Sequence, residues 1–411
     1  MPKRSGFRSA SLVLTSRCNL RCGYCYQNDK KPGRMSWATL RRALDLMLAS
    51  EEKSLRISFW GGEPLLEFPA VRRAVRYLED RREPERRIEY SLSTNGLLLD
   101  DAKVDFLAAH GVETQLSFDG IRAAQNHRGR GTFDVLDRRL DRIRERHPGF
   151  YEGRLQIALT LTVNNLPHLA DSIDYFLGKD VREIGIAPDT PAEPAWRPDD
   201  IARLDEQVAQ VFESSVRHYR RTGRIPLSIF RTRREERAAP RGTRPMCGAV
   251  HGRGMTVDVD GEVHGCLMFA GSYQRFRSAP IRDAVDSMRM GNVHDEPGAA
   301  DRAGYRAAVE RSGLFHRKER KYSSYGKCGE CEYIDRCTIC PMSTAGLPGN
   351  RDPDRVPDFP CAFHKVFLRF RDRFPSSPLR TFGDSGPFHD FFAALEERAG
   401  PAGLLHMLSR D

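Results

Sequence analysis

The chain has 411 residues and a formal net charge of +10, with 39% hydrophobic and 30% charged residues. This length allows one large domain, or a large and a smaller one, with a substantial core. No apolar run is long enough to span a membrane, and the first residues, MPKRSGFRSASLVLT, are too few and too polar for a signal peptide. We therefore expect a cytoplasmic protein without a membrane partner, whose cysteines bind metal rather than form disulfides.

Residues 10 to about 190 alternate between apolar runs and segments with apolar residues every three or four positions. The predicted strands are 10–15, 55–60, 88–94, 113–118, 155–163 and 181–187. The predicted helices are 39–48, 70–80, 102–111, 135–146 and 169–177. Such alternation predicts right-handed crossovers and a parallel sheet. Six strands are fewer than the eight of a closed barrel, so the predicted α/β fold is a curved, partly open (β/α)6 barrel.

The chain changes character after residue 190. A Pro-rich stretch leads to a predicted helix at about 201–221 and then to an arginine-dense segment. Residues 247–361 are loop-rich and hold seven cysteines, and the last fifty residues are helical in pattern. The predicted domains are 1–190, the partial barrel; 191–246, a helical and basic linker; 247–370, a cysteine-rich domain; and 371–411, a helical tail.

Three cysteines, Cys18, Cys22 and Cys25, directly follow the first predicted strand. Their short spacing lets three thiolates converge from one loop, but three ligands do not complete a four-ligand site. One interpretation is a zinc site with a distant fourth ligand. The other is a [4Fe-4S] cluster, which ordinarily takes four cysteines and here leaves one iron open.

The CxxxCxxC spacing, with Tyr24 before the last cysteine, resembles the signature of radical S-adenosylmethionine (radical SAM) enzymes. The resemblance implies that the open iron is chelated by the amino and carboxylate groups of S-adenosylmethionine. It also implies that reduction of the cluster cleaves this cosubstrate to a 5'-deoxyadenosyl radical, which abstracts hydrogen from a substrate.

Further motifs lie at the ends of the next three predicted strands, where the chemistry of a β/α barrel gathers. The second strand ends in GGEP, and the resemblance implies that Gly61, Gly62 and Glu63 hold the methionyl amino group. Glycines there allow a close backbone approach, and a carboxylate accepts from an ammonium group.

The third strand ends in STNG and the fourth in SFDG. By the same resemblance, Asn95, Ser117 and Arg128 contact the ribose and carboxylate of the cosubstrate, with Arg130 as the rival of Arg128. Asp119 is either a turn former or a catalytic residue.

The seven C-terminal cysteines contain CxxC-x5-CxxC, a pattern that also suits a zinc knuckle. Their full order resembles the SPASM domain, which carries two auxiliary [4Fe-4S] clusters, although its third interval is usually three residues and is two here. The resemblance assigns four cysteines to one cluster: Cys328, Cys331, Cys337 and Cys361. It assigns three to the other: Cys247, Cys266 and Cys340. The second cluster then keeps an iron open to His251, another protein ligand, water or substrate, and we expect this iron to be a substrate-binding or redox port.

The resemblance favours modification of a ribosomally synthesised peptide by cross-linking, oxidation or epimerisation. Formylglycine formation, as in anaerobic sulfatase maturases, is the second expectation, and a small-molecule substrate the third. Those maturases carry a catalytic Asp shortly before the first SPASM cysteine, where this chain has Glu235 and Glu236 as candidate bases.

The expected partners are a peptide or protein substrate and a flavodoxin or ferredoxin as electron donor. Seventeen residues before Cys18 leave no room there for a fused leader-binding module, so we expect either a separate leader-binding protein or direct binding of the substrate by the barrel and the basic segment 231–244. An alternative from another class is a basic, zinc-stabilised nucleic-acid-binding module, which would explain the charge and the CxxC pairs but not the strand-end motifs.

Overall fold

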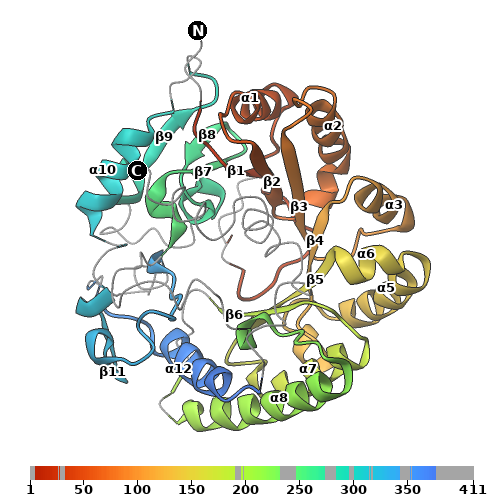
Figure 1. Ribbon diagram of the computed structural model, residues 1–411, viewed down its shortest axis with the longest axis vertical. Coiled ribbons are helices and arrows are strands. Elements are labelled where there is room, and N and C mark those ends of the chain that lie inside the picture. The colour runs from red at the N-terminus through yellow and green to blue at the C-terminus, as the bar shows by residue number, and fades with distance from the viewer. Residues whose placement is uncertain are drawn as a thin grey trace.

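The fold is a curved sheet with helices on its outer side (Figure 1). This computed structural model describes residues 5–25, 27, 33–189, 196–197, 199–231, 247–273, 284–295, 300–313, 315, 318–342, 352 and 354–375. The strands of the main sheet are β1 (Ser9–Thr15), β2 (Ser54–Gly61), β3 (Arg87–Thr94), β4 (Glu113–Ser117), β5 (Leu155–Leu161), β6 (Ile184–Pro188), β7 (Gly254–Val257), β8 (Glu262–His264) and β9 (Arg289–Asn292). A separate hairpin pairs β10 (Tyr322–Ser323) with β11 (Gly326–Lys327).

The predicted parallel sheet of six strands is confirmed. The strand order is β6-β5-β4-β3-β2-β1-β7-β8-β9, and every neighbouring pair from β1 to β6 is parallel. Because parallel strands run the same way, their carboxyl ends meet at one rim of the sheet, and the predicted motifs lie there.

Each of the first six strands lies where the sequence predicts it, with small shifts at its ends. The fifth strand ends at Leu161 rather than at residue 163, because Thr162 begins a turn in which its N–H donates to the Asn165 side chain at 2.8 Å. The sixth begins at Ile184 rather than at 181, because Asp180 adopts a positive φ of 54° and Val181 caps the preceding helix.

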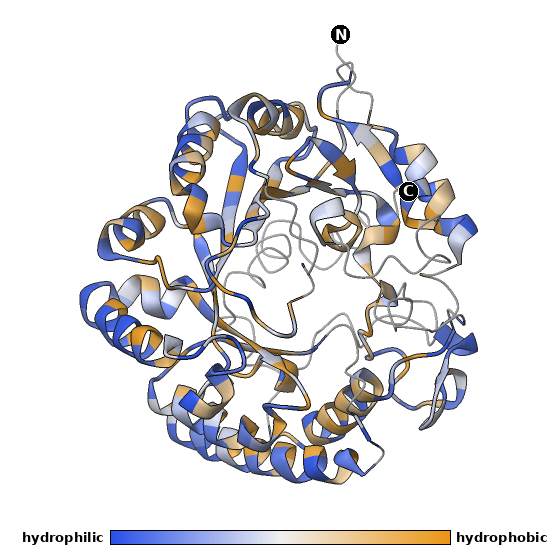
Figure 2. Ribbon diagram, turned by 180° about the vertical axis from the view of Figure 1, so that it is seen from behind, coloured by the Kyte–Doolittle hydropathy of each residue, from blue (hydrophilic) through white to orange (hydrophobic). Residues whose placement is uncertain are grey.

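The helices pack apolar faces against the sheet and turn polar faces outward (Figure 2). They are α1 (Trp37–Leu48), α2 (Phe68–Glu79), α3 (Asp101–Ala109), α4 (Arg122–Gln125), α5 (Thr132–Arg146), α6 (Pro148–Gly153), α7 (Leu169–Gly178), α8 (Asp200–Thr222), α10 (Arg302–Ser312) and α12 (Asp358–Asp372). In α5, for example, Leu136, Leu140 and Ile143 recur at helical spacing and are all buried. The five predicted helices of the first half and the long helix at about 201–221 are thus confirmed.

The cysteine-rich half joins the same sheet, which the sequence pattern does not reveal. Strand β7 pairs in parallel with β1, with Ser9 opposite Gly254 and Leu12 opposite Val257. Strands β8 and β9 then continue the sheet in antiparallel fashion. The pairing brings the loops that follow β8 next to the rim on which the first three cysteines lie.

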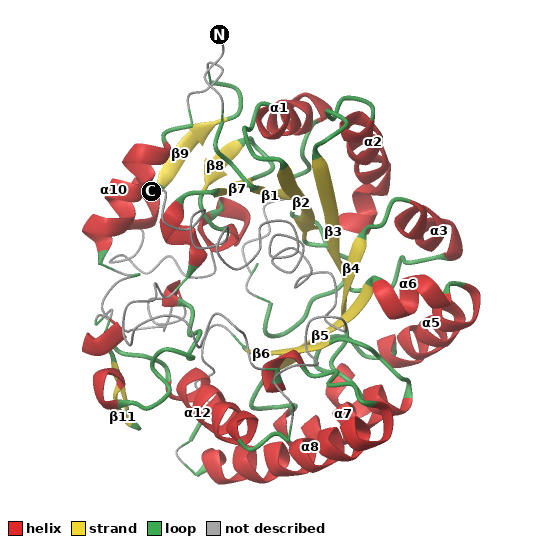
Figure 3. Cartoon of the chain, in the orientation of Figure 1, coloured by secondary structure: helices red, strands yellow, loops and turns green. Residues whose placement is uncertain are grey.

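The last described helix, α12, packs on α8 through aromatic rings. Phe370 and Phe212 have ring centres 5.4 Å apart, and Phe374, which follows α12, has its ring centre 5.8 Å from that of Phe212. Figure 3 shows α12 beside α8. Cys361 lies in the first turn of α12 and lines a cavity together with Cys328, Cys331 and Cys337. The predicted helix beyond residue 375 lies outside the described residues, and none of the described helices is both long and apolar enough to cross a membrane.

Candidate active site and iron-sulfur centres

A cavity of about 640 Å³ opens at the carboxyl ends of the parallel strands. Its wall contains the following sequence-predicted site residues: Cys18, Cys22, Tyr24, Cys25, Gly61, Gly62, Asn95, Ser117, Arg128 and Cys340. The structure therefore gathers residues from five separate motifs around one space. A volume of this size is within the range of small-molecule sites.

The three-cysteine loop follows β1 and lies in the cavity wall. The pKa of the Cys22 thiol is raised to about 11, chiefly by burial; the neighbouring Cys25 and Cys18 thiolates contribute to this rise, and Arg128 opposes it. Thiols that converge from one loop are a donor set that a bound metal centre deprotonates. These three residues therefore fit a [4Fe-4S] cluster that leaves one iron for a further ligand.

Tyr24, Asp119 and Arg128 form a buried network behind the three-cysteine loop. The Tyr24 hydroxyl donates to Asp119 in a short hydrogen bond, and Arg128 donates to both Asp119 oxygens, from Nη2 at 2.7 Å and from Nε at 3.2 Å. The Arg128 guanidinium also lies 5.3 Å from the centre of the Tyr24 ring. Although burial lowers the pKa of Arg128, the Asp119 carboxylate raises it above its usual range.

This network gives Asp119 a positioning role. Its side chain is fully buried and also accepts from the Thr160 N–H at 3.1 Å. Asp119 is absent from the cavity wall, whereas Tyr24 and Arg128 lie in it. Of the two candidate arginines, Arg128 faces the cavity and Arg130 is exposed.

The two glycines of GGEP allow the end of β2 to approach the three-cysteine loop. A Cβ on Gly61, whose φ is 157°, would lie 2.5 Å from the Thr15 carbonyl oxygen. A Cβ on Gly62 would lie 2.2 Å from the Arg17 carbonyl oxygen. Sequence reasoning attributes these glycines to contact with a ligand, but in the structure the close neighbour is the backbone that leads into the first cysteine.

Glu63 lies behind the cavity wall and ties GGEP to STNG. Its buried carboxylate accepts from the N–H groups of Asn95 at 2.7 Å and Leu65 at 3.0 Å, and from the Thr94 hydroxyl at 2.8 Å. Burial raises the pKa of Glu63, and these hydrogen bonds oppose the rise. Asn95 in turn donates from its side chain to Asn19 at 2.7 Å, inside the three-cysteine loop.

Sequence reasoning missed Asp189, which follows β6 and lies in the cavity wall, 2% exposed. Among the described residues of this wall it carries the only carboxylate. The strand-end rule that identified GGEP, STNG and SFDG would have found it if applied to the sixth strand. Glu235 and Glu236 lie outside the described residues.

The seven C-terminal cysteines separate into the two expected groups. The pKa of Cys266 is raised to about 12, chiefly by burial and then by the Cys340 thiolate, with a smaller contribution from Cys247. Cys340 and Met268 also face the large cavity. His251, a candidate fourth ligand, is exposed at the end of the turn that follows Cys247.

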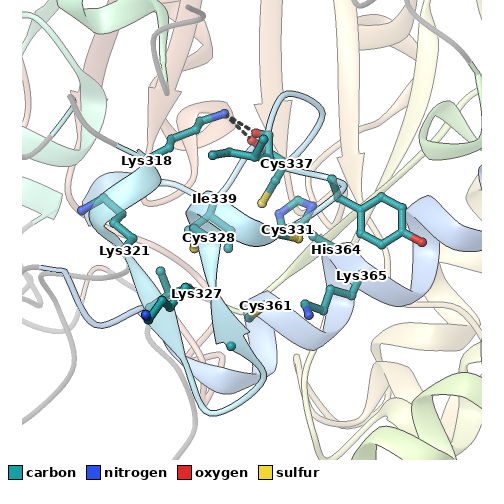
Figure 4. A pocket seen from close by; sticks show the side chains of 14 residues that line it. Lys318, Lys321, Lys327, Cys328, Cys331, Cys337, Ile339, Cys361, His364 and Lys365 are labelled. Atoms are coloured by element: carbon teal, nitrogen blue, oxygen red, sulfur yellow. Dashed lines mark hydrogen bonds between the residues drawn. The ribbon is translucent and has the colours of Figure 1, made fainter. Parts of the chain in front are cut away.

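The other four cysteines line a separate small cavity: Cys328, Cys331, Cys337 and Cys361. The pKa of Cys328 is raised to about 11, chiefly by burial, and the Cys361 and Cys331 thiolates contribute to this rise. Four cysteines around one cavity (Figure 4), three of them half-buried and Cys361 buried, fit a fully ligated [4Fe-4S] cluster. Within the described residues, no three His, Cys, Asp or Glu side chains are arranged to hold a single metal ion.

Residues 12–174 match the family model of the radical SAM superfamily. The chain is 33% identical over 144 residues to the serine-type anaerobic sulfatase-maturating enzyme of Klebsiella aerogenes, a match that covers 32% of this chain and 36% of the relative. It is 24% identical over 348 residues to the tungsten-containing aldehyde ferredoxin oxidoreductase cofactor-modifying protein of Pyrococcus furiosus, covering 82% of this chain and 91% of that protein. The chain spans 36% to 62% of the length of three curated relatives that it matches.

Two kinds of solved structure share the fold. The native enzyme anSMEcpe, solved with bound AdoMet and the Kp18Cys peptide, superposes with a TM-score of 0.68 at 19% identity, covering 89% of this chain and 97% of that one. Streptococcus suis SuiB, solved with its precursor peptide SuiA, superposes with a TM-score of 0.51 at 17% identity, covering 87% and 76%. The α/β partial barrel followed by a cysteine-rich region is thus the fold of these proteins too.

Replacing Asp119 by Asn tests the network behind the three-cysteine loop. The change leaves the buried Arg128 guanidinium without its counter-charge, which costs about 3–5 kcal/mol of the free energy of unfolding. We also expect the loss of up to about four irons per chain after anaerobic reconstitution, the content of one [4Fe-4S] site. Urea denaturation and iron analysis measure the two effects.

The matched control is Asp134→Asn, which breaks an exposed ion pair with Arg122. Exposed pairs contribute little, so stability and iron content should stay at parental values. Equal behaviour of the two variants would contradict the positioning role of Asp119.

Proposed function

Because this chain is a radical SAM enzyme, we propose that it modifies a ribosomally synthesised peptide. The observation that carries the proposal is the large cavity, whose wall runs from the three-cysteine loop to Cys340 and Met268 in the C-terminal half. A peptide side chain in this cavity would lie between the radical-generating site and the three-cysteine auxiliary site. The two solved structures with bound peptides support a peptide as the class of substrate.

The protein side chains would bind and orient the reactants. When bound, the first cluster and S-adenosylmethionine supply a 5'-deoxyadenosyl radical, which takes a hydrogen atom from the substrate. Cys18, Cys22 and Cys25 would hold that cluster, with Asn95, Ser117 and Arg128 toward the ribose and carboxylate of the cosubstrate. Gly61 and Gly62 offer backbone to the methionyl amino group, while Glu63 holds this turn from behind.

Asp189 is our candidate for the group that removes a proton from the substrate or binds its amine. Its carboxylate lies in the cavity wall, at the end of β6. A base must be within hydrogen-bond reach of the proton that it removes. A carboxylate in the cavity wall lies on the surface that a bound substrate would face.

Formylglycine formation is the second candidate. The sequence match to a serine-type sulfatase-maturating enzyme favours it, and Asp189 offers a carboxylate in the cavity although the segment before Cys247 contains no Asp. The match to a cofactor-modifying protein keeps a small molecule as the third candidate. For each of these three candidate functions, a flavodoxin or ferredoxin supplies the electrons. If the substrate is a peptide, a separate leader-binding protein is the expected partner.

Metal analysis tests the three-cluster assignment. We expect about twelve irons in the anaerobically reconstituted parent and about eight when Cys18, Cys22 and Cys25 are all changed to Ala, since each site holds four irons. Only the parent should release 5'-deoxyadenosine with dithionite. About four irons together with zinc would reduce the C-terminal half to a structural zinc domain.

A labelled peptide and an Asp189 variant test the class of substrate and the role of Asp189. We expect a cysteine-containing synthetic peptide, deuterated at its α and β carbons, to change in mass and to pass deuterium into 5'-deoxyadenosine. The Asp189→Asn variant should keep 5'-deoxyadenosine release within a few-fold but lose about 10²–10⁴-fold in peptide modification, the usual contribution of a general base.

The control for that variant is Asp174→Asn, an exposed change on α7 that should leave both rates unchanged. Mass spectrometry separates the candidates: a formylglycine product selects the second one. Deuterium-free 5'-deoxyadenosine and an unchanged peptide would reject a peptide substrate of this kind.

Spectroscopy tests the ligands of the site formed by Cys247, Cys266 and Cys340. In substrate-free protein we expect the spectroscopic signature of a cluster with one non-cysteine ligand, since this chain offers three cysteines there. Addition of the cysteine peptide should change that signature, whereas its serine counterpart should not. Complete cysteine-like ligation before any peptide is added would rule out the substrate port.

A further inference from the structure

Two glutamines lie side by side in the wall of the large cavity, and no step of the proposed reaction uses them. They are Gln115 on β4 and Gln156 on β5, which are partners in the parallel register of these two strands. Both are half-buried, whereas the residues before and after each of them are buried. Because side chains alternate between the faces of a sheet, both amides are on the face that the cavity occupies.

Small side chains separate the two glutamines from the rim of the sheet. Two positions further along the strands, the register partners are Ser117 on β4, Ala158 on β5 and Gly185 on β6. A Cβ on Gly185 would have the Ile157 carbonyl oxygen as its nearest neighbour, at 3.7 Å, so this part of the wall has room. Two residues of a parallel strand span about 6.6 Å. The glutamines therefore form a floor at the end of an open path from the rim.

The floor carries amides and no charge. Among the described residues of the cavity wall, the charged side chains are Arg128, which is paired with Asp119, and Asp189. They belong to segments that follow the carboxyl ends of β4 and β6, and not to the level of the glutamines. A charged group on the floor would lose water without gaining a counter-charge, which is unfavourable. An apolar group would leave the two amides without hydrogen bonds.

The cavity wall also contains a buried donor that is ready for a ligand. Gln27, which follows the three-cysteine loop, is 3% exposed, and its Nε2 has no hydrogen-bond partner among the described residues. Buried polar groups of folded proteins are almost always hydrogen-bonded. The occupant of this cavity is therefore a molecule with polar groups of its own.

A carboxamide fits the floor best. Each glutamine amide has a carbonyl oxygen that accepts and an NH₂ group that donates, so the neighbouring pair can present one donor and one acceptor. A carboxamide offers the complementary acceptor and donor and is neutral. The depth of the floor favours a side chain over a peptide backbone, because a peptide that follows the rim can extend a side chain past the small residues.

We propose that Gln115 and Gln156 form a specificity site for a carboxamide side chain, that of Asn or Gln, in the substrate peptide. One glutamine donates to the carbonyl oxygen of the carboxamide, and the other accepts from its NH₂ group. No covalent bond is formed or broken here; the site fixes which neighbouring residue faces the radical-generating end of the cavity. The inference rests on the proposed function for the peptide that carries the carboxamide.

The first part of the test uses cysteine-containing synthetic peptides and the reconstituted full-length protein. In an alanine background, one Asn is moved a position at a time along either side of the cysteine. At one position Asn should raise kcat/KM about tenfold over Ala, the size of effect that hydrogen bonds of this kind give. Asp and Leu, which have the shape of Asn, should not. Gln115→Leu and Gln156→Leu should each abolish the preference, chiefly through KM.

Two further variants separate recognition from structure. Gln156→Glu keeps the shape of the side chain and makes the floor anionic, so it should move the preference at that position from Asn toward Lys. Gln210→Leu, an exposed change on α8, should keep the parental preference. Iron analysis shows that each variant is fully loaded.

The second part of the test needs no peptide. Ligand-observed NMR measures the binding of propionamide, propionate and propylamine to the same protein. We expect the parent to bind propionamide in preference to the two charged analogues. The double variant Gln115→Leu with Gln156→Leu should lose this binding.

The proposal is overturned if no position prefers Asn, or if the preference survives both Leu changes. It is also overturned if the Leu variants raise the KM for S-adenosylmethionine as much as the KM for the peptide, since the glutamines would then bind the cosubstrate. If no peptide is modified but propionamide binds to the parent and not to the double variant, the peptide is rejected and the carboxamide site stands. Failure of both parts rejects the site and the peptide together.

Discussion

The parallel alignment of β1 to β6 is the constraint on which the site depends, because it brings the ends of six strands to one rim. Two buried carboxylates then hold neighbouring strand ends together. Glu63 joins the end of β2 to the end of β3 through the Asn95 N–H and the Thr94 hydroxyl. Asp119 joins the end of β4 to Tyr24 in the three-cysteine loop and to Arg128. A loop of three cysteines has little internal structure, so these outside contacts are what position it.

The two residues also show how a buried motif carboxylate can hold several strand ends in place. A buried carboxylate must be fully hydrogen-bonded or paired, and both of these are. Their partners come from separate motifs, so a change in either one moves several parts of the wall at once. Asp189 is the contrast, since it lies in the cavity wall itself.

The auxiliary sites differ in what surrounds them. The three-cysteine group shares the large cavity through Cys340, which favours a role close to the substrate. The four-cysteine group has its own cavity, and lysines form much of that wall. The sheet pairing of β1 with β7 and the packing of α12 on α8 hold both groups beside the barrel.

The local sequence pattern alone determined the six parallel strands and the helices between them. The alternation of strands and helices predicted the parallel sheet to within three residues at each strand end, because periodicity reports which faces are buried. The spacing of Cys18, Cys22 and Cys25 predicted one sulfur-rich site, because closely spaced ligands can converge from one loop, and the family resemblance divided the other seven cysteines between two further sites.

Tertiary structure decided the rest, since it depends on contacts between residues far apart in the chain. Strand β7 joins β1 across more than half of the sequence, and no local signal marks that pairing. Glu63 and Asp119 have motif positions that suggest ligand contact, but burial and partners from other strands give them a positioning role. The lysines around Cys361 are ordinary surface residues by sequence, and only the fold places them around one cavity.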